Sequence, residues 1–151
     1  MKRFRFSLRP VAILRAHRDS RARGLFATAV RAYVKSEEEL AAIRQRVTAF
    51  EAALFAGRRE TFAAAAEAFT LAAYRRESGL EIAAERAVFA ARAEMGRRRE
   101  DYLEAHRQLE VMTRLEQKAR EGYRLAANRA EQAEFDEFAG RRAGRSRFSR
   151  V

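Results

Sequence analysis

The sequence predicts an all-α fold, a long antiparallel two-helix coiled-coil hairpin whose C-terminal helix overhangs the first. Three observations predict it. Alanine, arginine and glutamate dominate the 151 residues, with one proline and no tryptophan or cysteine, a composition typical of long helices and coiled coils. Apolar residues recur at every third or fourth position along two stretches, and no region alternates with period two. The repeat breaks once, around Gly57, so we expect a single rod over residues 1–151 that turns there.

The first helix is expected over about residues 10–56. Pro10 suits the first helical turn, because its fixed φ fits a helix and its missing N–H would be unpaired there. The positions expected to face the second helix repeat at about 3.6 residues per turn, which suits a nearly straight helix. This first seam runs through Leu14, Arg18, Ala22, Leu25, Ala29, Ala32, Ser36, Leu40, Ile43, Val47, Phe50 and Leu54.

A turn is expected at residues 57–59, followed by a second helix over about 60–140 and a basic tail over 141–151. Gly57 suits a helix C-terminus and Glu60 suits the first turn of a new helix. The second seam repeats at about 3.55 residues, close to the value of a left-handed supercoil. It runs through Phe62, Ala66, Phe69, Ala73, Arg76, Leu80, Ala84, Val88, Ala91, Met95, Arg98, Tyr102, Ala105, Leu109, Met112, Glu116, Ala119, Tyr123, Ala126, Ala130 and Ala133.

The two helices differ in length. Joined by a short turn they pack antiparallel, which places the acids of residues 37–39 near Arg75 and Arg76. At ~1.5 Å per residue the first helix spans roughly 70 Å and the second roughly 120 Å. About 30 residues of the second helix, 107–139, should therefore lack a partner in this chain. Because an isolated helix is marginal in water, we expect this overhang to need another protein for full order.

Positive charge is concentrated at the two ends of the chain. Residues 1–23 carry +7 and residues 141–151 carry +5, which leaves about −1 of the total +11 for the middle. This pattern favours ends that contact an acidic partner. Two alternatives are arginines that only keep the rod in solution, and a basic coiled coil that binds nucleic acid or an anionic membrane surface.

The sequence gives no sign of catalysis, and we expect no enzyme, no cofactor and no metal. His17 and His106 lack the further ligands of a zinc site, and a rod offers no closed cleft that would perturb a carboxylate pKa. The absence of cysteine fits a reducing compartment. No apolar run approaches the roughly 20 residues that span a bilayer. We therefore expect a cytoplasmic protein with no membrane insertion.

The stretch "EFDEFAGRR" near the C-terminus is the strongest candidate site. Phe135 and Phe138 lie off the predicted seam, so packing within the chain does not explain them. They stand beside Asp136 and Glu137, and Glu137 can pair with Arg141 four residues on. Exposed aromatic rings beside charges of both signs are typical of a protein interface, although a fraying helix end is the simpler alternative.

These residues also resemble a known family. "NRAEQAEFDEFAGRRA", residues 128–143, is similar to the C-terminal signature of the FliJ family of flagellar export stalk proteins, N-R-x-x-Q-x-x-x-D-E-F-A-x-R. The start, "FRFSLRPVAILRAHRDSRAR", residues 4–23, resembles the family's F-x-F-x-L opening and basic helix. The alanine-rich centre departs from the family, which more often carries larger side chains there.

The resemblance implies a component of the flagellar type III export apparatus, peripheral at the cytoplasmic side of the inner membrane at the flagellar base. Such proteins resemble the central stalk of rotary ATPases, insert their terminal end into the hexameric export ATPase, contact the cytoplasmic domain of the export gate and escort export chaperones. The residues expected at the ATPase are Arg15, Arg18, Arg21, Phe135, Asp136, Glu137, Phe138 and Arg141. Those expected at the gate are Glu39, Ile43, Phe50, Leu80 and Ala83.

Two other interpretations remain open at this point. One is the basic coiled coil that binds nucleic acid or a membrane surface, although such a protein gains nothing from the acidic "EFDEF". The other is the related stalk of an injectisome-type secretion system. The D-E-F-A ending favours the flagellar branch over the injectisome branch. We expect no specific nucleic acid as a partner.

Overall fold

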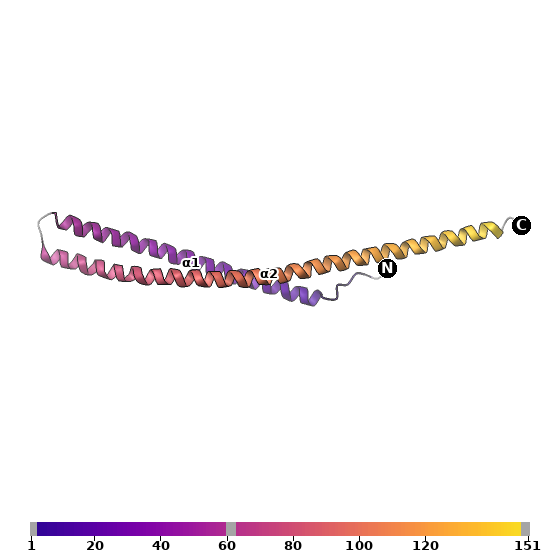
Figure 1. Cartoon of the computed structure of the whole chain (residues 1–151), viewed down its shortest axis with the longest axis horizontal. Helices are drawn as coiled ribbons and strands as arrows, with labels where there is room; N and C mark the ends of the chain where they lie inside the picture. The colour runs from indigo at the N-terminus through magenta and orange to yellow at the C-terminus, as the bar shows by residue number, and fades with distance from the viewer. Residues whose placement is uncertain (1–2, 60–62, 149–151) are drawn as a thin grey trace. The chain divides into compact units, whose positions relative to one another are not determined.

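A computed structural model describes residues 3–59 and 63–148, and side chains up to residue 141. It contains two long helices, α1 (Arg9–Gly57) and α2 (Ala64–Phe148), which pack against each other as a hairpin (Figure 1). No strand occurs in the two described ranges. The predicted fold class is therefore confirmed.

The helix ends differ from the prediction on the side of α2. α1 ends at Gly57, close to the expected residue, and Arg59 N donates to Ala56 O over 3.0 Å in the turn that follows. α2 begins at Ala64, and the expected first turn at residues 60–62 lies outside the described residues. α2 also continues to Phe148, so the stretch 141–148 is helical and the prediction of a separate tail was wrong there. A glycine inside a helix costs only about 1 kcal/mol, which is too little for Gly140 to end it.

Contacts divide the chain into two compact units, and each helix contributes to both. Residues 19–105 form one unit, and residues 1–18 with 106–151 form the other. The first unit has the larger share of the small core. Its buried apolar side chains are Ala29, Leu40 and Val47 on α1 and Ala73 on α2.

Arginine–glutamate pairs fix the register between the helices in the unit of residues 19–105. Arg44 contacts Glu81 at 3.0 Å and Glu85 at 2.7 Å, and Arg46 contacts Glu77 at 3.0 Å. Folding the chain at residue 57 would instead have set residue 44 opposite about residue 70.

The expected pairing of the acids at 37–39 with Arg75 and Arg76 was therefore wrong. The connection is longer than a three-residue turn, since α2 begins only at Ala64. The observed pairs place each α1 residue about three turns further along α2 than predicted, which is more than the longer connection alone accounts for.

The second half of the first seam and the middle of the second were predicted well, whereas the first turns of each helix were not. Leu25 is 43% exposed, and the next residue, Phe26, faces α2 in its place. The Phe26 ring stacks on the Tyr102 ring, with 6.1 Å between the ring centres. The Arg23 guanidinium lies 5.8 Å from the centre of the Tyr102 ring. Asp19 is buried and pairs with Arg23 at 3.3 Å. An aromatic contact with a cation–π interaction thus takes the place of the aliphatic stripe that periodicity suggested.

The same shift occurs where α2 begins. Phe69 is 79% exposed and Leu80 is 46% exposed, although both were expected in the seam. The half-buried positions are Thr70 and Glu77 instead. Periodicity shows that an apolar stripe exists, but it does not decide between two stripes one residue apart.

In the other unit, the N-terminal residues cover part of α2. Arg15 donates a hydrogen bond to Gln108 Oε1. Further along α2, the Phe4 ring lies 5.5 Å from that of Tyr123, and Arg120 lies 5.7 Å from the centre of the Phe4 ring. The cover therefore reaches Tyr123, and the expectation that α2 lacks a partner from residue 107 onward was wrong for its first turns.

Candidate functional site

The free end of α2 is the part of the helix that no other described segment covers. Every residue from 128 to 141 is exposed, after the half-buried Ala127. Alanine, glutamate and glutamine are frequent here and are good helix formers, which accounts for the helix without a packed face. We call residues 128–141 the free end.

Two aromatic rings stand out on the free end. Phe135 is 73% exposed and Phe138 is 67% exposed. With Glu131 and Glu134 they line an open groove on the helix surface. Rings of this size that stay in water on a helix without a partner are candidates for burial against another protein.

The charges of the free end are held locally. Arg141 donates to Glu137 over 2.6 Å, which confirms the pairing expected from their spacing. Both side chains are mostly exposed, so this pair contributes little stability. Asp136 is exposed beside them. The surface therefore offers apolar rings together with both signs of charge.

The arginines expected at the same interface lie elsewhere. Arg15 is half-buried against Gln108, and Arg18 is exposed. At ~1.5 Å per residue, Phe135 lies about 40 Å further along α2 than Gln108, so these arginines and the free end do not form one cluster. Arg21 is exposed in the unit of residues 19–105.

The residues expected at the export gate all belong to that same unit. Glu39 is exposed and pairs with Lys35 at 3.8 Å. Ile43 precedes Arg44, and Leu80 precedes its partner Glu81, so these two lie in the same stretch of the hairpin. Leu80 and Ala83 are exposed, whereas Ile43 and Phe50 are half-buried between the helices. Phe50 lies about two helical turns beyond Ile43.

The sequence reasoning missed the aromatic contact that fastens the N-terminal segment. Phe4 and Phe6 are half-buried while Arg3 and Arg5 are exposed. This alternation is typical of an extended segment with one covered face. The same alternation of aromatic and basic residues is visible in the "FRFSL" opening of the sequence.

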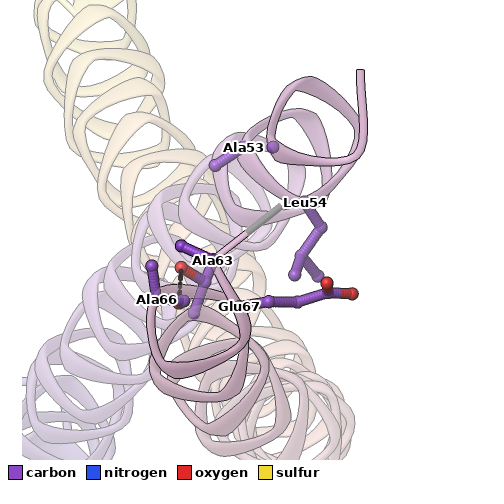
Figure 2. A pocket seen from close by; sticks show the side chains of 7 residues that line it. Ala53, Leu54, Ala63, Ala66 and Glu67 are labelled. Atoms are coloured by element: carbon purple, nitrogen blue, oxygen red, sulfur yellow. Dashed lines mark hydrogen bonds between the residues drawn. The ribbon is translucent and has the colours of Figure 1, made fainter. Parts of the chain in front are cut away.

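A small cavity lies where the two helices meet the connection (Figure 2). Its volume is about 110 Å³, and it is lined largely by small side chains, including Ala53 and Ala66. Glu67 borders it and accepts a hydrogen bond from Arg58 over 3.1 Å. The small side chains let the helices end close together, and the Arg58–Glu67 pair joins the two sides of the connection.

Other kinds of site find no support in the described residues. No group of three or more histidine, cysteine, aspartate or glutamate side chains could hold a metal ion within ranges 3–59 and 63–141. No described helix combines the length and apolarity that crossing a membrane requires.

A comparison with protein families gives a match over almost the whole chain. Residues 4–148 match the family described as the flagellar FliJ protein. The chain belongs to the FliJ family. It is therefore a non-catalytic component of the flagellar export apparatus. Searches among curated proteins and among solved structures found no match.

Proposed function

We propose that this protein is the central stalk and adaptor of the flagellar export ATPase. In this role it holds the ATPase ring with one end of the hairpin, contacts the cytoplasmic domain of the export gate with its middle, and escorts export chaperones. Membership of the FliJ family supports a place in the flagellar export apparatus. The free end of α2 supports attachment to the ATPase ring through this helix.

The observation that carries the proposal is the exposed run from residue 128 to residue 141. A single helix is about 10–12 Å across with its side chains, a narrow object with free surface on all sides. Such a helix can be enclosed by several subunits at once, as a stalk inside a ring would be. Phe135 and Phe138 would then bury their rings, while Asp136, Glu137 and Arg141 would meet polar groups of the ring.

The arginines of α1 have a separate role in this proposal. Arg18 and Arg21 are exposed side chains of α1, and neither belongs to the free end. They would meet acidic groups of the ring's subunits. The gate would contact the stretch that contains Glu39, Leu80 and Ala83, where side chains are exposed beside the Arg44 ion pairs.

The test is stimulation of ATP hydrolysis by the purified export ATPase. Phe135→Ala with Phe138→Ala should abolish most of the stimulation while circular dichroism shows unchanged helix content. Phe89→Ala is the matched control, because Phe89 is similarly exposed, at 77%, but belongs to the unit of residues 19–105 and not to the free end. Stimulation that survives the double change, or that Phe89→Ala removes equally, would refute attachment through these rings.

The purified chain also serves to test the alternative that this protein binds nucleic acid. A phosphate-binding protein loses affinity steeply as salt rises. Tight DNA binding with such a salt dependence, together with no effect on the ATPase, would replace the stalk by a nucleic-acid binder.

A further inference from the structure

The segment of residues 3–8 contacts α2 without belonging to either helix. It precedes the first residue of α1, Arg9, and it ends in a turn at residues 7–8. Its Phe4 ring contacts two side chains of α2. The centre of the Phe4 ring lies 5.5 Å from that of the Tyr123 ring and 5.7 Å from the Arg120 guanidinium. We call residues 3–8 the strap.

The strap is attached to α2 by side chains only. In the described part of the chain no backbone hydrogen bond joins the strap to α2. The backbone hydrogen bonds that the strap does form go to α1. Phe6 O accepts from Arg9 N over 3.2 Å, and Leu8 O accepts from Ala12 N over 3.0 Å. A change of backbone conformation before Leu8 can therefore release the strap while α1 stays intact.

We propose that the strap opens from α2 while the hairpin stays folded, and that the closed strap stops a partner from enclosing α2 at Tyr123. The first part concerns this chain alone, whereas the second rests on the proposed stalk function. Tyr123 is half-buried, but residues 117–122 and 124–126 are exposed. The strap thus covers one side of a helix that is otherwise in water.

Opening lengthens the part of α2 that a partner can enclose on all sides. The run of residues 128–141, which is exposed in the closed state, is ~21 Å long at ~1.5 Å per residue. With the strap open, α2 is uncovered from about residue 117, and the run up to residue 141 is ~37 Å long.

The closed strap is also easily displaced. An aromatic pair with a cation–π contact favours closure by about tenfold, which corresponds to about 1.4 kcal/mol. A partner that binds only the open state binds more weakly by the same factor, because the population of the competent state sets the apparent affinity. The strap is therefore an autoinhibitory contact that an enclosing partner must displace.

A tryptophan at position 4 tests the opening, since the chain has no tryptophan of its own. Phe4→Trp keeps an aromatic ring for Tyr123 and Arg120, and its fluorescence reports whether this ring is covered. During urea unfolding, the emission should become that of tryptophan in water at a lower urea concentration than the loss of helix measured by circular dichroism. Coincident transitions would mean that the strap opens only when the hairpin unfolds, and they would overturn the proposal.

A second change in the Phe4→Trp chain tests the contact itself. Adding Tyr123→Ala should give the emission of the open strap without urea, while helix content stays unchanged. Adding Leu125→Ala is the matched control and should leave the emission as it was, because Leu125 is 58% exposed. An emission that Tyr123→Ala does not change would show that the strap does not lie against Tyr123, and it would overturn the proposal.

Stimulation of the export ATPase tests the inhibitory role. Phe4→Ala should lower the concentration of this chain that gives half-maximal stimulation by about tenfold. The control Phe55→Ala removes a ring that is 71% exposed and should leave this concentration unchanged. An unchanged or higher concentration for Phe4→Ala would overturn the inhibitory role. A wild-type chain that gives no stimulation would instead refute the stalk function, and the urea experiment would still decide whether the strap opens.

Discussion

Replacing Leu40 by alanine should destabilise the hairpin by about 2 kcal/mol. Leu40 is one of the few core residues and is only 8% exposed. The change removes three carbon groups, each worth ~0.8 kcal/mol when buried, or about 2.4 kcal/mol before allowing for the exposed fraction. No large cavity term is added, because a two-helix interface is open to solvent at its edges. For a chain of this size, the melting temperature should fall by about 4–8 °C.

Leu80→Ala is the control for this experiment. Periodicity places Leu80 in the seam as firmly as Leu40, yet it is 46% exposed. Leu80→Ala should therefore lower the free energy of unfolding by about half as much as Leu40→Ala, near 1.3 kcal/mol on the same scale. Urea unfolding followed by circular dichroism measures both variants. Equal losses for Leu40→Ala and Leu80→Ala would refute the register described here, because they would mean that the stripe containing Leu80 is the buried one.

Two further predictions concern local contacts. Tyr33 donates a hydrogen bond to the Glu37 carboxylate, which raises the pKa of Tyr33. The stabilisation of the fold by this hydrogen bond should be complete below the pKa of Tyr33 in the unfolded chain, about 10. It should be lost as the pH rises through the pKa of Tyr33 in the folded chain. Glu37→Gln should therefore lower the pH at which the Tyr33 phenolate appears, with Tyr33→Phe used to assign the signal, and an unmoved titration would contradict the contact. Phe4→Ala should speed amide exchange over residues 4–8 and around Tyr123 without loss of helix content. The control Phe55→Ala removes a ring that is 71% exposed and should leave exchange in these stretches unchanged. Equal exchange in both variants would argue against the Phe4–Tyr123 contact.

Local sequence patterns determined much of the fold because each helix carries its own signal. The end of α1 at Gly57 and the stripe from Ala29 to Leu54 follow from composition and spacing alone. The register did not follow, since it depends on where α2 begins. An alanine-rich stretch that includes residues 63–66 has no strong start signal, and a few residues of error there move every pair between the helices.

The choice between neighbouring stripes also needed the structure. Arg15 and Asp19 face inward where Leu14 and Arg18 were expected. Each inward polar group gains a partner, Gln108 for Arg15 and Arg23 for Asp19, and a buried polar group is stable only when it has one. Such pairs join residues far apart in the sequence or depend on side-chain geometry, so periodicity does not reveal them.

For the candidate site, the sequence located the two rings and the pairing of Glu137 with Arg141, because those are local features of one helix. It placed the arginines of α1 at the same interface only through the family resemblance. The structure sets Arg15 beside Gln108 instead, about 40 Å from Phe135 along α2. The two groups can therefore serve one partner only if that partner extends along the helix.

Amide hydrogen exchange over residues 128–141, with and without the export ATPase, tests whether the free end is uncovered in this chain and is buried by the ATPase. In the monomeric chain, we expect fast exchange over residues 128–141 and slower exchange in the buried stretch around Leu40, because only the latter is packed. With the ATPase present, exchange over 128–141 should slow markedly while the stretch around Leu40 stays unchanged. Slow exchange over 128–141 in the monomer would show that the free end is already covered, and no change when the ATPase is added would show that the ATPase does not bind it.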